Sequence, residues 1–184
     1  MDNKVAKWSK WAEAICEDCG NVMLSRDMFL DLHRMLQKHP EMQQADYFHE
    51  YMRDTYIAHV TMMLRKHAKK SSNGISLALL ASDMQANHVQ VSGVSLEPDF
   101  DSAIQRFETC AAKVEAFADR VVAHNDPRPP AHTPTYNEID EAIEAMDVLS
   151  VKCSMAVGGN YCDTCKPTVQ YGWLNIFRDM GIET

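Results

Sequence analysis

The chain has 184 residues, which is enough for one domain with a hydrophobic core of its own. Hydrophobic residues make up 46% and charged residues 24%, as in globular proteins, and the formal net charge of −8 disfavours binding of nucleic acid or anionic lipid by bulk attraction. No apolar run reaches the roughly 20 residues that span a bilayer, and the N-terminal segment lacks the apolar core of a signal peptide. We therefore expect a cytosolic protein without a membrane partner, whose six cysteines are thiols or metal ligands rather than disulfides.

The first third of the sequence predicts three helices. Apolar residues recur at steps of three and four over 8–23, which indicates one face of a first helix. Ser25 is suited to cap a second helix over 26–38, which is expected to end before Pro40. A third, longer helix is predicted over 45–70.

The middle of the chain predicts two further helices. A polar turn and a short aliphatic helix are expected within 71–88, followed by a loop over 89–99. Apolar residues from Phe100 to Val121 then form an uninterrupted stripe at helical spacing. The prolines within 125–134 cannot continue that helix, because they remove backbone donors and clash with the preceding turn.

The last part of the chain begins with a capping box. Thr135 and Glu138 have the spacing of this motif, and the helix that they begin is expected to end at Gly158 and Gly159. A short helix over 169–180 completes the chain, and neither repeats nor strand-like alternation are found. The sequence therefore predicts an all-α fold, a single bundle of six or seven helices in one domain.

The helix before the proline-rich break ends in two residues suited to phosphoryl chemistry, Arg120 and His124. Four positions apart, they share one face of a helix. A histidine moves protons near neutral pH and an arginine neutralises a pentavalent phosphate, as metal-independent RNA cleavage by a 2′-hydroxyl requires. Asn125 and Asp126 are candidates to orient the histidine, and Arg128 is a candidate phosphate contact. The alternative is an ordinary polar helix end, where cations are favoured without any function.

One dense group of cations lies at the end of the predicted third helix: Arg65, Lys66, Lys69 and Lys70. As a functional patch, the group binds the backbone of RNA. As a structural feature, it is a solvated helix end whose charges complement the helix dipole.

Two Cys-x-x-Cys pairs stand near the two ends of the chain: Cys16 with Cys19, and Cys162 with Cys165. Four thiolates suit a tetrahedral zinc ion, and packing of the terminal segments side by side brings such distant pairs together. Alternatively, the first pair consists of small buried hydrophobes on a helix face. The other two cysteines are expected to be packing residues: Cys110 and Cys153.

Two stretches carry a family resemblance. "FETCAAKVEAFADRVVAHNDPR" (107–128) resembles the motif helix of the HEPN superfamily, in its AbiU-like abortive-infection branch, where an arginine-containing helix ends in "AH", a polar residue and Asp. "MMLRKHAKKSSNGISLALLASDM" (62–84) resembles the basic helix end, polar turn and following helix of the same branch.

The resemblance implies a helical bundle that dimerises in a bacterial defence or toxin–antitoxin setting. Active members are endoribonucleases with an Arg/His motif at the dimer cleft, so His124 would be the general acid or base and Arg120 the phosphate-binding group. Expected partners are a second copy of the chain, RNA, and a protein such as an antitoxin. The Arg-to-His spacing is shorter than in the family motif, and Val121 replaces a polar residue. The alternative is therefore a non-catalytic interaction protein, stapled by a structural zinc.

Overall fold

Helices form all the regular structure in the part of the chain that the computed structural model describes: residues 3–39, 46–70, 74–123, 131–161, 163–168 and 172–179. The α-helices are α1 (Asn3–Lys38), α2 (Asp46–Ala68), α3 (Leu77–Asn87), α4 (Phe100–Phe117), α5 (Tyr136–Ala156) and the short α6 (Asn175–Asp179). A 3-10 turn, η2 (His88–Gln90), follows α3, and a π-helical turn, η3 (Ala118–Ala123), continues α4. The all-α prediction is confirmed.

The number of helices was predicted wrongly, because α1 does not break at Ser25. It runs unbroken for 36 residues and replaces the two predicted helices. Ser25 lies within the helix, where its hydroxyl donates to the carbonyl of Asn21 at 2.9 Å instead of capping a new start. Over the described ranges the bundle therefore has five long helices, and α6 adds only five residues.

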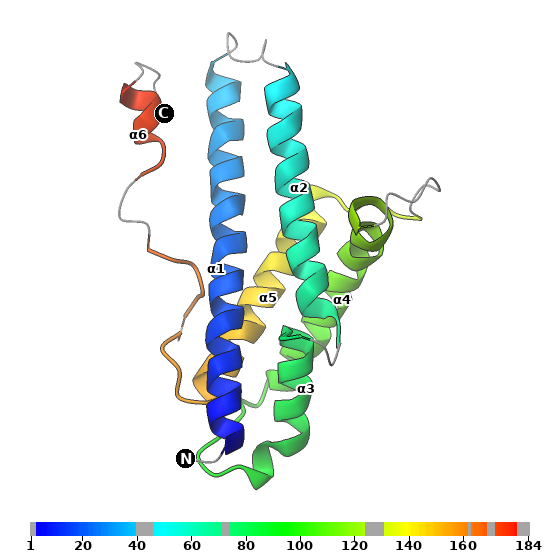
Figure 1. Ribbon diagram of the computed structural model, residues 1–184, viewed down its shortest axis with the longest axis vertical. Coiled ribbons are helices and arrows are strands. Elements are labelled where there is room, and N and C mark those ends of the chain that lie inside the picture. Colours follow the sequence, from blue (N-terminus) through cyan, green and yellow to red (C-terminus); the bar gives the residue numbers. More distant parts are fainter. Residues whose placement is uncertain are drawn as a thin grey trace.

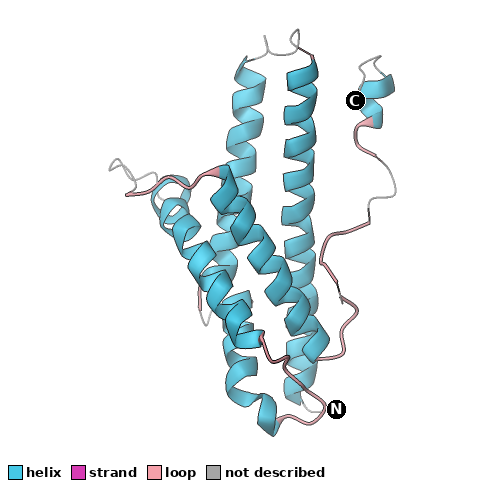
Figure 2. Ribbon diagram, turned by 180° about the vertical axis from the view of Figure 1, so that it is seen from behind, coloured by secondary structure: helices cyan, strands magenta, loops and turns pink. Residues whose placement is uncertain are grey.

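The two longest helices form a hairpin on which the others pack. α1 and α2 lie side by side and extend together beyond the rest of the bundle at one end (Figure 1). α4 and α5 cross the hairpin obliquely on one side, and α3 packs near the N-terminus (Figure 2). The C-terminal segment runs along α1 to α6, which lies near the projecting end (Figures 1 and 2).

The core lies where α1, α2, α3, α4 and α5 meet. Trp8 is fully buried, and its indole N–H donates to Asp83 Oδ2 at 2.9 Å, so the buried ring keeps a polar partner. The predicted stripe of α4 is buried from Phe100 to Ala118. Val121 leaves the stripe and is 38% exposed, because the π turn winds more widely than an α-helix.

Both predicted ends of α5 are confirmed. The hydroxyl of Thr135 accepts from the backbone N–H of Glu138, whose carboxylate accepts from the backbone N–H of Thr135 at 3.0 Å. At the other end Gly158 has a φ of 71°, and the N–H of Gly159 donates to the carbonyl of Ser154 at 2.8 Å. This Schellman motif ends the helix and turns the chain back towards α1.

Candidate functional site

The described part of the segment predicted to hold the Arg/His pair is the π turn η3. Arg120 lies on it with an exposed side chain. Turns of this type are rare in proteins, and those that occur often lie at functional sites. The other predicted residues of this site lie outside the described ranges: His124, Asn125, Asp126 and Arg128. The pairing of Arg120 with His124 therefore stays a prediction.

Asp119, next to Arg120, joins η3 to the basic end of α2. Lys69 Nζ lies 3.0 Å and 3.2 Å from the two carboxylate oxygens, and Arg65 Nε also donates to this carboxylate. Partial burial opposes ionisation of Asp119, but the hydrogen bonds from Lys69 and Arg65 outweigh it and lower the pKa. The structure thus brings part of the predicted RNA-binding group next to the predicted catalytic segment.

The other two cations of the basic group also bond acidic residues. Lys66 Nζ lies 2.6 Å from Asp18 Oδ2 on α1, and Lys70 Nζ lies 2.7 Å from Glu108 Oε1 on α4. The first of these ion pairs helps to lower the pKa of Asp18 to about 2, after the larger contribution of a hydrogen bond with His67. A phosphate at this group has to compete with carboxylates of the same chain.

A thiol cluster forms where the C-terminal segment meets the middle of α1. Cys16 and Cys19 project from one face of α1 and are fully buried, and Cys165 is 2% exposed. The sulfurs of Cys19 and Cys165 and a carboxylate oxygen of Asp147 on α5 all lie within 4.8 Å of one another. Three of the four cysteines predicted as zinc ligands are therefore brought together, and Cys162 lies outside the described residues.

Asp147 holds the backbone beside the cluster. Its Oδ1 accepts from the N–H of Cys165 at 2.7 Å, and its Oδ2 accepts from the hydroxyl of Thr164 at 2.8 Å. The hydroxyl of Thr164 also accepts from the N–H of Lys166 at 3.1 Å, which fixes the turn of the chain at this point. The backbone position of Cys165 is thus set by hydrogen bonds around it.

Gly20 allows the C-terminal segment to approach α1 closely. A Cβ atom at this position would lie 2.7 Å from the carbonyl oxygen of Cys165, which is shorter than the contacts that Cβ atoms make in proteins. Neither Gly20 nor Asp147 was predicted from the sequence. The glycine had a signal, because a glycine inside a helical pattern usually has a packing reason. The aspartate had none, since one acidic residue in an amphipathic helix is ordinary.

Two thiols of the cluster, those of Cys16 and Cys165, have a pKa raised above the ordinary value. Contact with Cys165, followed by burial, raises the pKa of the Cys16 thiol well above its ordinary value. Burial likewise raises the pKa of Cys153, the adjacent core thiol of α5, which agrees with its predicted packing role. A bound cation would favour the thiolate forms of these sulfur donors.

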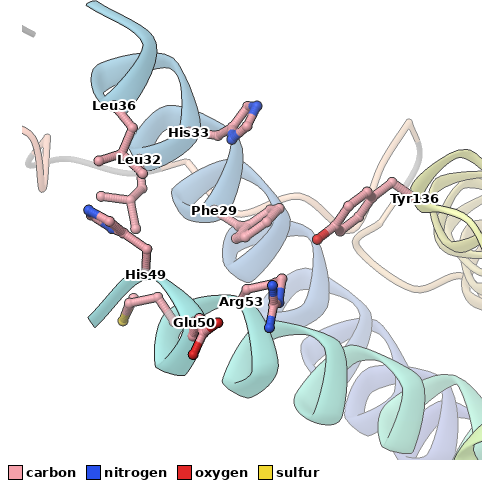
Figure 3. Close-up of a pocket in the computed structure, with 9 residues that line it drawn as sticks. Phe29, Leu32, His33, Leu36, His49, Glu50, Arg53 and Tyr136 are labelled. Carbon is pink, nitrogen blue, oxygen red and sulfur yellow. The ribbon is translucent and has the colours of Figure 1, made fainter. Parts of the chain in front are cut away.

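A different, aromatic pocket lies between α1, α2 and the start of α5. It has a volume of about 400 Å³, and the rings of Phe29 and Tyr136, which both line it, stack with their centroids 5.6 Å apart (Figure 3). Phe29 also stacks on Tyr56 of α2, with ring centroids 4.2 Å apart. None of the predicted site residues that the structure describes lines this pocket.

The C-terminal segment lines a second, neighbouring cavity of about 220 Å³. Trp173 and Phe177 contribute the wall opposite Met28 of α1 and Phe48 of α2. The indole N–H of Trp173 donates to Asp31 Oδ2 at 3.3 Å, which ties the segment to α1. Apolar surface at the projecting end of the hairpin is thus partly covered by the end of the chain.

Comparison with known proteins gives no matching family model, no matching curated protein and no matching solved structure. None of the described helices is long and apolar enough to cross a membrane.

Proposed function

We propose that this chain is a HEPN-like helical protein of a bacterial defence or toxin–antitoxin system, which acts in the cytoplasm as a homodimer and cleaves RNA without a metal ion. Two sequence stretches support the proposal through their resemblance to the AbiU-like branch. The observation that carries it is the contact between them, where Lys69 and Arg65 of the basic stretch bond Asp119 of the motif stretch.

In the proposed reaction His124 acts as the general acid or base on the 2′-hydroxyl and the leaving oxygen. Arg120 binds the phosphate and neutralises the charge that develops on it. Asn125 and Asp126 orient the histidine, and Arg128 adds a phosphate contact. The basic group at the end of α2 and directly after it binds the adjacent RNA backbone, in exchange for some of its ion pairs within the chain.

Cleavage of a labelled single-stranded RNA in the presence of EDTA tests this proposal. His124→Ala is expected to lower the rate by at least about 100-fold, because a positioned acid or base contributes that much. His33→Ala serves as the control, since His33 is exposed on α1 and lies outside both motif stretches. Equal rates for wild type and His124→Ala, or no cleavage by either, would contradict RNA cleavage at this site.

The second candidate is a non-catalytic interaction protein that binds a protein such as an antitoxin, or RNA. The ion pairs of the basic group favour it, because Lys66 and Lys70 are bound to Asp18 and Glu108 within the chain. The net charge of −8 favours it too. It predicts no RNA cleavage by wild type, together with a saturable complex with the partner that His124→Ala leaves unchanged.

A further inference from the structure

We propose that Cys16, Cys19 and Cys165 bind one Zn²⁺ ion, which fastens the C-terminal segment to α1. The inference is independent of the proposed RNA cleavage, because none of the three thiols belongs to either motif stretch. Buried thiols from two distant parts of the chain meet here: the sulfurs of Cys19 and Cys165 lie within 4.8 Å of each other and of a carboxylate oxygen of Asp147, and the thiol of Cys16 is in contact with that of Cys165.

The spacing of the cluster suits a tetrahedral metal site. With Zn–S bonds of about 2.3 Å, ligand sulfurs of a tetrahedral site are about 3.8 Å apart. The sulfurs of Cys19 and Cys165 lie within 4.8 Å of each other, so rotation of side chains brings them to that distance. Cys16 lies one helical turn before Cys19 on the same face of α1, and its thiol is in contact with that of Cys165.

The chemistry of the donors selects zinc over harder cations. Thiolates bind zinc and other soft metals, whereas magnesium and calcium prefer oxygen ligands. Each thiol releases its proton to solvent as its bond to zinc forms, so binding is a simple exchange of protons for the metal ion. Zinc is not redox-active, and no oxidant is required.

The surroundings are those of a built site. Asp147 accepts from the backbone of Cys165 and from Thr164, and such outer hydrogen bonds orient metal ligands. Gly20 leaves room for the carbonyl of Cys165 against α1. Asp147 and Gly20 thus hold the C-terminal segment against α1 and α5 at Cys165. Within the described residues 163–168 the segment has no helical hydrogen bonds, so bonds to a metal ion would be its strongest attachment.

The metal would determine where the end of the chain lies. The described residues 163–168 rest on α1 and α5 at the thiol cluster, and Trp173 and Phe177 further along line the apolar cavity on α1 and α2. Anchoring Cys165 shortens the free chain that has to be ordered before these aromatic rings reach the cavity. Loss of the metal is expected to loosen the segment and to expose the cavity.

Metal analysis of the full chain tests the proposal. Protein purified under reducing conditions without chelator is expected to hold close to one zinc ion per chain. Cys19→Ser and Cys165→Ser are expected to hold much less. Cys110→Ser is the matched control, because Cys110 lies on α4 outside the cluster, and it should retain the metal. Less than about 0.2 zinc per wild-type chain would overturn the proposal, since thiolate sites hold zinc tightly.

A second measurement keeps the test valid if the serine variants do not fold. Wild-type protein treated with a strong chelator should melt at a lower temperature, and its tryptophan emission should change as Trp173 becomes exposed. Restoring zinc should reverse both changes, whereas magnesium should not. Full reversal by magnesium, no response to the chelator, or an intact mass showing a disulfide between these cysteines would each contradict a zinc site.

Discussion

The backbone N–H of Cys165 donates to Asp147 Oδ1 at 2.7 Å, which links the C-terminal segment to α5 beside the thiols of α1. The same carboxylate also holds Thr164. A residue near the end of the chain is thus positioned by a helix of the core before any metal is considered. Substitution of Asp147 therefore tests whether this carboxylate positions Cys165 in the thiol cluster.

Asp147→Asn should weaken zinc binding about 10- to 100-fold, the usual effect of losing an outer-shell carboxylate. The amide keeps one acceptor oxygen but loses the charge and the second acceptor, so Thr164 or Cys165 loses its partner. Competition with a chromophoric chelator measures the affinity. Asp163→Asn, an exposed neighbour of the cluster, is the control. Equal affinities of Asp147→Asn and wild type would exclude this orienting role.

Cys162 is the fourth ligand that the sequence predicts, and Cys162→Ser tests it. In cobalt-substituted protein, replacing one of four thiolates should lower the intensity of the sulfur-to-metal charge-transfer band and weaken binding. The control is again Cys110→Ser. An unchanged cobalt spectrum in Cys162→Ser would show that the fourth ligand is another group.

Gly20→Ala should destabilise the protein, although the same change in an open helix stabilises by up to about 1 kcal/mol. The new methyl group would lie 2.7 Å from the carbonyl oxygen of Cys165, and relief requires moving a backbone. A loss of about 1–3 kcal/mol is expected in urea unfolding, as for other overpacked sites. Gly74→Ala, where no atom lies within 4 Å of the added group, should be nearly neutral. A more stable Gly20→Ala protein would mean that the segment does not pack here.

Asp119→Asn should remove stability that depends on pH. The pKa of Asp119 is lowered in the folded chain from an ordinary 3.8, so its ion pairs stabilise the protein above that pH. The contribution is lost as the pH falls through the lowered pKa of the folded state. Since the carboxylate is partly exposed, the loss at neutral pH should stay below about 1 kcal/mol.

Urea unfolding at several pH values measures this effect. The difference between wild type and Asp119→Asn should be largest near pH 7 and should shrink below about pH 4. Glu141→Gln, an exposed carboxylate on α5, gives the control curve. A difference that does not vary with pH would contradict an electrostatic role for Asp119.

Periodicity and capping predicted much of the fold because these signals are local. The stripe of α4 and the capping box of Thr135 depend on residues within one or two turns of each other, and both are found. The wrong prediction of a helix start at Ser25 also came from a local signal. Serine is suited to a helix start and also tolerated within a helix when its hydroxyl bonds the preceding turn, and only the packing of α1 distinguishes these cases.

The thiol cluster could be predicted in part. The two Cys-x-x-Cys pairs supply the thiol ligands, and packing of the two terminal segments against each other brings the pairs together. The role of Asp147 could not be predicted, and the glycine at position 20 signals close packing without naming its partner, because both roles depend on a contact between segments far apart in sequence. The same holds for Asp119, whose partners Arg65 and Lys69 lie at the end of α2 and directly after it.

The continuity of α1 has a mechanical consequence. A helix of 36 residues is about 54 Å long, and without a break it behaves as one stiff rod. Cys19 and Phe29 are about 15 Å apart along this rod, at a rise of 1.5 Å per residue. If α1 rotates about its axis at the thiols, the aromatic surface at the projecting end therefore rotates with it by the same angle.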